Sequence, residues 1–351
     1  LPILNAGISC QFGSGEVVAM NEMQPVIQDA LDLVEFANGD STTIWGRKRI
    51  SFGHAQPFHL KMIGIGNENF GPQYIERYKL FEKALKAAYP QISLVFCCIY
   101  SSREDNMKYV DSLMKETRID IIDEHYYKSP AWFLKNSGLY DTYDRKLPKV
   151  FIGEYSALTS TMGSEENKND IETAVAEAAF MTGLERNADV VTMASYAPLF
   201  SHMTDWQWKP NLIWFDNGKS FATPNYYVQQ LFSLNKGTKL ISITLNDQAI
   251  CGQDSIWASA VIDGQTNELI VKLVNPAGSS RNKTIYIQGL KKSNGLAELI
   301  TLKGATPGDS NSVEYPKAII PSNGKAIVKN KKLFLKIAPY SVNVLKVPLQ
   351  K

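Results

Sequence analysis

The sequence predicts an α/β domain built on a parallel sheet, followed by a domain made only of β-strands. Up to about residue 234, short apolar runs alternate with amphipathic helical patterns, and this order implies parallel strands joined by helical crossovers. After Gly237 no helical pattern of useful length remains, and short strand-like runs follow one another between Gly, Pro, Asn and Asp turns. The first part fits a doubly wound sheet or a β/α barrel, and the second fits a sandwich that begins near 235–238.

Strand and helix patterns alternate regularly through the first part. We expect its strands at 2–9, 60–65, 92–99, 119–123, 150–152 and 190–196. We expect its helices at 21–37, 73–88, 104–117, 132–143, 171–185 and 226–234. A polar loop with Trp45, Arg47, His54 and Pro57 is expected before the second strand. A barrel of eight strands would need two more strands than these six.

Eight strand patterns make up the second part. They lie at 240–245, 257–262, 268–274, 283–288, 297–302, 325–329, 332–337 and 341–347. Most of them alternate apolar and polar residues, which is typical of strands with one face in a core.

Composition and net charge exclude some classes of binding partner. The 351 residues include 37 basic and 35 acidic ones, so the formal net charge is only +2 and no basic stripe for nucleic acid or anionic lipid is evident. The four cysteines show neither metal-ligand spacing nor a disulfide framework. No stretch is long and apolar enough to span a bilayer. A small neutral molecule or a polysaccharide is therefore the expected partner, with no nucleic acid and no membrane.

Two strands end in a glutamate. The stretch LKMIGIGNENFGP carries Glu68 after an apolar run, and LPKVFIGEYSA carries Glu154 in the same way. Retaining glycosidases need two carboxyl groups about 5–5.5 Å apart, and the strand ends of a β/α barrel can supply them. Glu68 could instead stabilise the start of the following helix. Asn67 and Asn69 on either side argue against that, because one capping group would suffice.

Several longer motifs resemble glycoside hydrolase family 51, the α-L-arabinofuranosidases. They are GNENFGPQYIERYKLFEKALKAAYP, DEHYYKSP, YDTYDRKLPKVFIGEYSA, EAAFMTGLERNADVVTMASYAPLF and WKPNLIWFD, in the order found in the family. Together they cover roughly residues 3–235. The Asn-Glu pair marks the wider clan, whereas ERNADVV with MASYAPL points to this family. The resemblance implies a (β/α)8 TIM barrel, of which six strands are present, in residues 1–236 and a β-sandwich domain in residues 237–351.

The resemblance also implies roles for single residues. Glu68 matches the family's acid/base, Glu154 its nucleophile, and Asn67 a residue that hydrogen-bonds the sugar 2-hydroxyl. Tyr127 matches a tyrosine that hydrogen-bonds the nucleophile. Asn211 is a candidate for a further sugar contact. No metal and no cofactor are expected.

Four aromatic or imidazole positions near these motifs allow other interpretations. Trp206 and Trp208 could line the mouth of the site or serve the fold. Phe70 stands where tryptophan is common in the family. His125 lacks a nucleophilic Ser or Cys motif, so a structural, hydrogen-bonded histidine is favoured over a triad base.

The resemblance further implies an arabinose-containing polysaccharide or oligosaccharide as substrate and a secreted or periplasmic location. Family members begin with a β domain and two barrel strands that this sequence lacks, so the missing segment is expected in the same chain or in a separate one. The oligomeric state is open, a homo-oligomer included. Two alternatives are another retaining glycosidase of the clan, such as a xylosidase or endoglucanase, and a non-catalytic carbohydrate-binding or structural fragment.

Overall fold

A computed structural model describes residues 1–9, 15–97, 108, 110, 112–289 and 295–349. The chain forms two compact units, 1–125 with 145–153 and 126–144 with 154–351. Two strands, β4 (Ile121–Lys128) and β5 (Lys149–Ala157), continue from the first unit into the second. Among the described residues, no helix has the length and apolar character needed to cross a bilayer.

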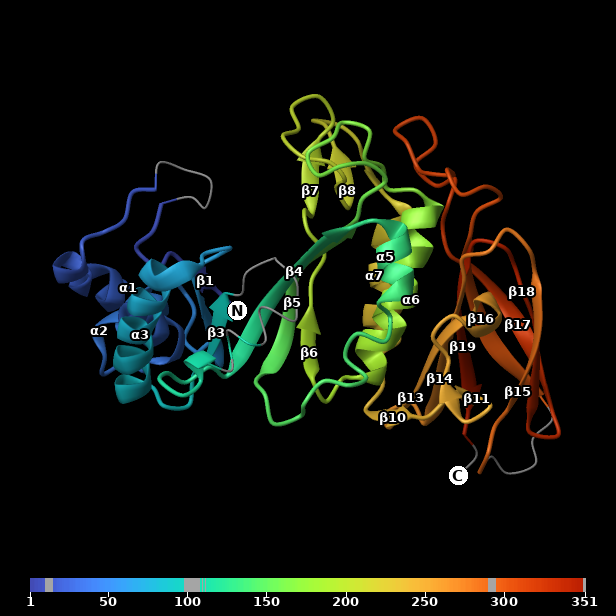
Figure 1. The fold of residues 1–351 in the computed structure, drawn as a ribbon, viewed down its shortest axis with the longest axis horizontal. Helices are drawn as coiled ribbons and strands as arrows, with labels where there is room; N and C mark the ends of the chain where they lie inside the picture. The colour runs from blue at the N-terminus through green and yellow to red at the C-terminus, as the bar shows by residue number, and fades with distance from the viewer. Residues whose placement is uncertain (10–14, 98–107, 109, 111, 290–294, 350–351) are drawn as a thin grey trace. The chain divides into compact units, whose positions relative to one another are not determined.

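The first unit contains parallel strands covered by helices (Figure 1). β1 (Ile3–Leu4), β2 (Met62–Ile65), β3 (Ser93–Cys97) and β4 are neighbours in that order, and each pair is parallel. The strands β2 and β3 are buried along nearly their whole length, as strands with both faces covered must be. Because β2 and β3 are parallel, their carboxyl ends lie at the same edge of the sheet.

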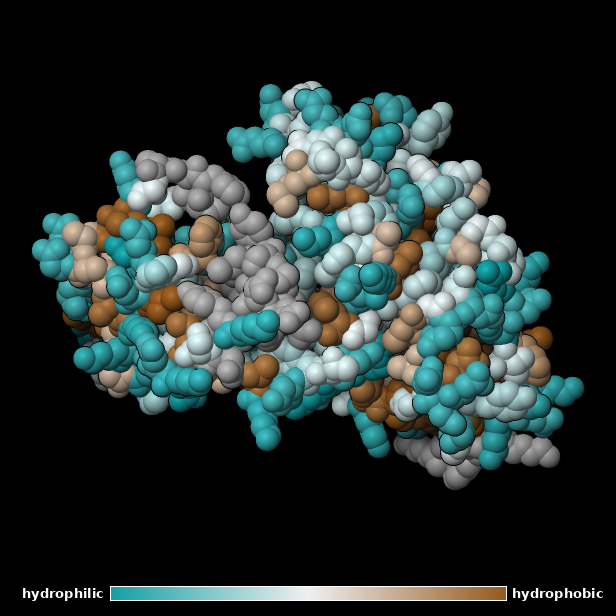
Figure 2. All heavy atoms as spheres, viewed as in Figure 1, coloured by the Kyte–Doolittle hydropathy of each residue, from teal (hydrophilic) through white to brown (hydrophobic). Residues whose placement is uncertain are grey.

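Two helices, α1 (Gln24–Asn38) and α3 (Gly71–Ala88), share a core with this sheet, and α2 (Ile44–Ser51) packs against α1. Both α1 and α3 have a proline in the first turn, where its missing N–H costs no hydrogen bond. The helix α3 contributes Tyr78, Phe81 and Leu85 to the core shared with β2 and β3. Hydrophobic side chains also reach the surface over these helices (Figure 2), and Ile44 and Phe52 are 71% and 61% exposed.

The prediction of a polar loop between α1 and β2 is wrong for residues 44–51, which form the helix α2. Thr43 caps it, because its hydroxyl oxygen accepts a hydrogen bond from the Gly46 N–H at 3.1 Å. Its buried side is held by Arg49, whose guanidinium donates to the carbonyl oxygens of Phe36, Gly39, His54 and Ala55. An arginine at the centre of the buried face hides the apolar periodicity by which helices are predicted.

The α/β part continues into the second unit. Its elements are the end of β5, β6 (Val191–Ala194), β7 (Phe200–His202), β8 (Ile213–Phe215), β9 (Ser220–Ala222), α5 (Pro130–Lys135), α6 (Ile171–Arg186) and α7 (Pro224–Leu234). β1 to β6 follow one another in chain order in a six-stranded sheet, and β7, β8 and β9 form a small separate sheet. The helix predicted at 132–143 is shorter, since α5 ends at Lys135 and turns follow. The helix predicted at 104–117 falls on residues that the structure describes only in part.

The remaining strands form one antiparallel sheet of eight. They are β10 (Lys239–Ile241), β13 (Trp257–Asp263), β14 (Glu268–Asn275), β15 (Arg281–Tyr286), β16 (Gly295–Lys303), β17 (Ser322–Lys329), β18 (Lys332–Ile337) and β19 (Ser341–Pro348). Their order is β10-β13-β14-β19-β16-β17-β18-β15, and a hairpin of β11 (Thr244–Leu245) and β12 (Gln248–Ala249) lies outside it. The all-β prediction holds, but the strands form one continuous sheet. It encloses a core because inner-face residues of both halves, such as Val271 and Leu335, share one apolar cluster.

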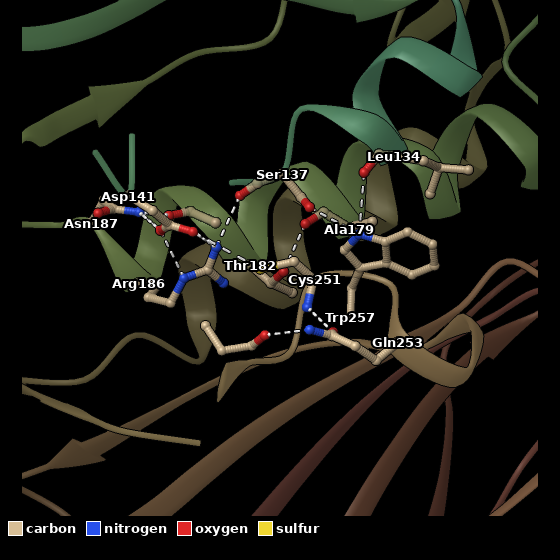
Figure 3. Close-up of polar contacts among 12 residues, drawn as sticks. Leu134, Ser137, Asp141, Ala179, Thr182, Arg186, Asn187, Cys251, Gln253 and Trp257 are labelled. Carbon is tan, nitrogen blue, oxygen red and sulfur yellow. Dashed lines mark hydrogen bonds and ion pairs between the residues drawn. The ribbon is translucent and has the colours of Figure 1, made fainter. Parts of the chain in front are cut away.

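The β domain packs on α5 and α6 within the second unit (Figures 1 and 3). The Trp257 indole N–H donates to the Ser137 hydroxyl at 2.9 Å and to the Leu134 carbonyl at 3.2 Å. Elsewhere in this contact the wholly buried Lys272 ammonium binds a Glu185 carboxylate oxygen at 2.5 Å and the Asn235 carbonyl at 2.7 Å. Burial lowers the pKa of Lys272, whereas Glu185 acts against that shift.

Candidate active site

Glu68 lies in a strained turn between β2 and α3. Its φ is +50°, a left-handed conformation that is uncommon for a residue other than glycine. The turn is organised by the buried Asn69, whose side-chain oxygen accepts a hydrogen bond from the Asn67 N–H at 3.1 Å. Gly66 has φ +80°, and a Cβ there would lie 2.6 Å from the Asn69 oxygen. Such strain at an acidic residue supports a functional role for Glu68.

His125 holds the Glu68 carboxylate. Its Nδ1 lies 3.0 Å from Glu68 Oε1, and its Nε2 lies 3.4 Å from Asp123 Oδ2. The other oxygen of Asp123 accepts a hydrogen bond from the Gly153 N–H at 2.9 Å. Asp123 and His125 are 4% and 6% exposed, so little water competes for these contacts. The prediction of a hydrogen-bonded histidine holds, but its partner is the candidate acid/base itself.

Glu154 lies on β5 and is held by Tyr127. The Tyr127 hydroxyl donates to Glu154 Oε2 at 2.6 Å, which is the contact that the family resemblance implies. A hydroxyl donor this close fixes the orientation of the carboxylate. The Trp208 and Tyr127 rings form an edge-to-face pair, with centroids 5.5 Å apart. This contact gives Trp208 a supporting position beside the candidate nucleophile.

Gly153 precedes Glu154 because no larger residue fits there. A Cβ at Gly153 would lie 2.2 Å from Asp123 Oδ1. The glycine therefore lets the Asp123 carboxylate reach the backbone N–H of β5.

The contacts of the remaining predicted residues, Asn211, Asn67 and Trp206, do not by themselves assign them a role at the site. Asn211 is 2% exposed, and its side-chain amide donates to the Trp208 carbonyl, so it ties the loop together. Its contact with a sugar stays a prediction. Asn67 is exposed beside Glu68. Lys209 Nζ lies 4.1 Å from the centre of the Trp206 ring.

A buried acid that the sequence analysis did not single out supports the end of β5. Glu177 on α6 is wholly buried, and one of its oxygens accepts a hydrogen bond from the Ala157 N–H at 2.8 Å. The other accepts from the Asn225 amide at 2.8 Å. Burial raises the pKa of Glu177 to about 8. The sequence signal that could have revealed Glu177 is an acidic residue among the alanines of the helix predicted at 171–185.

Comparison with known families identifies the chain. Residues 1–145 match the family described as "Alpha-L-arabinofuranosidase 1 domain", and residues 153–341 match "Alpha-L-arabinofuranosidase C-terminal domain". The chain belongs to the α-L-arabinofuranosidases of glycoside hydrolase family 51.

Individual α-L-arabinofuranosidases agree with this assignment. An extracellular exo-α-L-arabinofuranosidase of Streptomyces chartreusis is 42% identical over 248 residues, which is 69% of this chain and 28% of that protein. α-L-Arabinofuranosidase 1 of Arabidopsis thaliana is 31% identical over 97% of this chain and 48% of its own length. The chain thus spans half or less of these relatives.

Solved α-L-arabinofuranosidase structures have the same fold. An arabinose-bound family 51 enzyme superimposes with a TM-score of 0.88 and 30% identity, covering 99% of this chain and 54% of that one. The enzyme of Thermotoga maritima, solved with arabinose, has a TM-score of 0.73 at 21% identity and covers 92% of this chain and 73% of its own. The architecture is accordingly a TIM-barrel-like domain with a β domain.

Proposed function

We propose that the protein is a retaining glycoside hydrolase that releases terminal α-L-arabinofuranosyl groups from arabinoxylan or arabinan. The observation that carries the proposal is that two glutamates, one in the turn after β2 and one on β5, are each held by a side chain of β4. His125 binds Glu68, and Tyr127 binds Glu154. His125 and Tyr127 are two positions apart on β4. Relatives named as α-L-arabinofuranosidases support the same activity.

In this reaction Glu154 attacks the anomeric carbon while Glu68 gives its proton to the departing oxygen. The bond to the leaving group breaks as the arabinosyl–Glu154 ester forms. Glu68, now ionised, takes a proton from water, and that water displaces Glu154 from the sugar. Tyr127 holds Glu154 in position before the attack. Asn67, beside Glu68, is the proposed donor to the sugar 2-hydroxyl.

We also propose that the catalytic barrel occupies residues 1–236 and the β domain residues 237–351. The change from helices to strands between Leu234 and Lys239 supports this division. A closed (β/α)8 barrel needs two strands beyond the six of the main sheet. Strands outside these residues, from the same chain or a separate one, would complete it.

The test uses the full-length protein and 4-nitrophenyl α-L-arabinofuranoside. Glu154→Ala and Glu68→Ala should each lose activity by several orders of magnitude, and azide should rescue both. With Glu154→Ala the azide replaces the nucleophile, so the product should be the inverted arabinosyl azide. With Glu68→Ala it replaces water, so the product should keep its configuration. Wild-type rates in both variants would contradict the proposed roles.

A panel of nitrophenyl glycosides separates the related activities. A xylanase of Talaromyces cellulolyticus shares only the fold, with a TM-score of 0.60 at 12% identity. We expect the arabinofuranoside to be cleaved far faster than the xyloside or glucoside. No cleavage of any member would favour a non-catalytic role instead.

A further inference from the structure

One face of the β domain combines exposed apolar side chains with uncompensated positive charge. It lies on the outer side of β15, β17 and β18, whose inner residues, such as Val328 and Leu335, fill the core. Side chains alternate between the two faces, so the neighbouring residues point to solvent. We define the basic-aromatic face as Tyr286, Ile327, Lys329, Lys331, Lys332 and Phe334.

The apolar part of this face is continuous across strands. Ile327 on β17 lies directly opposite Phe334 on β18 in the ladder, and Leu296 of β16 lies opposite Ile327. Ile327 is 58% exposed and Phe334 46%. Tyr286, 67% exposed, lies opposite Lys332 on the next pair of strands. Single exposed hydrophobic residues are ordinary, but a row aligned over three strands marks a binding surface.

The charged part is concentrated at one hairpin. Lys329 and Lys332 are direct partners across β17 and β18, a like-charge pairing that destabilises a sheet. The turn between them is Asn330-Lys331, with φ of +51° and +64°. Such a turn favours glycine at its second position, where this chain has a further lysine. The hairpin therefore places three lysines close together, although Lys329 and Lys332 repel each other and both turn residues have a strained backbone.

Little in the described part of the chain offsets this charge. The ion pairs found there do not include Lys329, Lys331 or Lys332. The Lys332 ammonium lies over the Tyr286 ring, 4.9 Å from its centre, and that contact leaves the net charge unchanged. On adjoining strands Glu298 is paired opposite Lys325, so this acid and base balance each other.

We propose that the basic-aromatic face binds a polysaccharide that carries carboxylate groups. The lysines would pair with uronate carboxylates and relieve their mutual repulsion, while Ile327 and Phe334 would contact the apolar faces of the sugar rings. A rigid two-residue hairpin suits an extended polymer because little ordering is lost on binding. The inference extends the proposed function, since a polymer held by this chain raises the local concentration of its arabinosyl side groups.

The test is affinity electrophoresis of the full chain in gels containing polygalacturonate or neutral debranched arabinan. Polygalacturonate should retard the protein, and the retardation should fall with added salt. Lys329→Glu/Lys332→Glu should weaken binding at least tenfold, and Phe334→Ser should weaken it less. Lys236→Glu/Lys239→Glu is the matched control, because Lys239 lies on β10 at the other end of the sheet order.

Several results would overturn the proposal. They are equal retardation of the hairpin variant and the control, equal retardation in neutral arabinan, and tighter binding to duplex DNA or to vesicles of anionic lipid. The variant Lys329→Gln/Lys332→Gln removes the charges without reversing them, and its melting temperature shows whether it is folded. This variant should also lose binding.

Failure of the proposed function can be told apart from failure of this inference. Cleavage of 4-nitrophenyl α-L-arabinofuranoside should be unchanged in the hairpin variants, because this substrate has no carboxylate. Glu154→Ala should still be retarded by polygalacturonate. An inactive wild-type protein that still binds polygalacturonate would leave the binding surface standing and reject the catalytic proposal alone.

Discussion

The buried Glu177 gives a pH dependence of stability whose size follows from the structure. Burial raises its pKa from the ordinary 4.5 to about 8. Between these values the folded protein holds a proton that the unfolded chain releases, so stability falls as pH rises. One such proton changes the free energy of unfolding by about 1.4 kcal/mol per pH unit. From pH 5.5 to 7.5 the loss should be roughly 3 kcal/mol.

Glu177→Gln should remove this dependence. Glutamine keeps an oxygen for the Ala157 N–H, and the Asn225 amide can turn so that its own oxygen accepts from the new amide. Melting temperatures measured from pH 5.5 to 7.5 should fall less in the variant than in the wild type, by several degrees. Glu165→Gln, at an exposed position in the loop before α6, should behave as the wild type does. Equal slopes in the wild type and Glu177→Gln would refute the reasoning.

Three other substitutions test separate contacts. Tyr127→Phe removes a hydrogen bond to a carboxylate worth about 1.5–3 kcal/mol, so kcat/KM should fall roughly 10- to 150-fold while the melting temperature changes little. An unchanged kcat/KM would exclude the contact from catalysis. Lys272→Ala leaves the Glu185 carboxylate without its buried partner and should cost about 3–5 kcal/mol in denaturant unfolding. Gly153→Ala should lower both stability and kcat, because its Cβ would lie 2.2 Å from Asp123 Oδ1; wild-type values would show that β5 can shift freely.

The sequence predicted the regular elements because their side chains follow simple periods. The strands β2, β3 and β5 are apolar runs, and α3 and α6 have good helix formers with clear starts. In the β domain, strands such as β15 and β18 alternate inward and outward residues, whereas β14 is an apolar run buried on both faces. Positions where polar groups replace apolar ones were missed. Arg49 holds α2 through four backbone carbonyls, a contact that no hydrophobic pattern records.

The candidate site likewise has features that the sequence predicts and features that it does not. Glu68 follows the apolar strand β2, so its position after a strand end could be predicted from the sequence alone, whereas Glu154 lies inside β5, which continues to Ala157 beyond the predicted strand end. The part played by His125 could not, because it depends on Asp123 and Glu68 approaching the same imidazole from different segments. The hydrogen-bond partners of Glu177 could not be predicted for a related reason, since they come from β5 and α7. Long-range hydrogen bonds of this kind carry no local signal.

The most direct test of the catalytic account is to trap the covalent intermediate. Glu68→Ala should still form the arabinosyl-enzyme from dinitrophenyl α-L-arabinofuranoside, whose leaving group needs no acid, but should hydrolyse it slowly without a base. Peptide mass spectrometry of the quenched protein is then expected to find one anhydropentose on the peptide containing Glu154. A sugar attached to any other residue, or no adduct while dinitrophenol is released in a burst, would contradict the assignment of Glu154 as nucleophile.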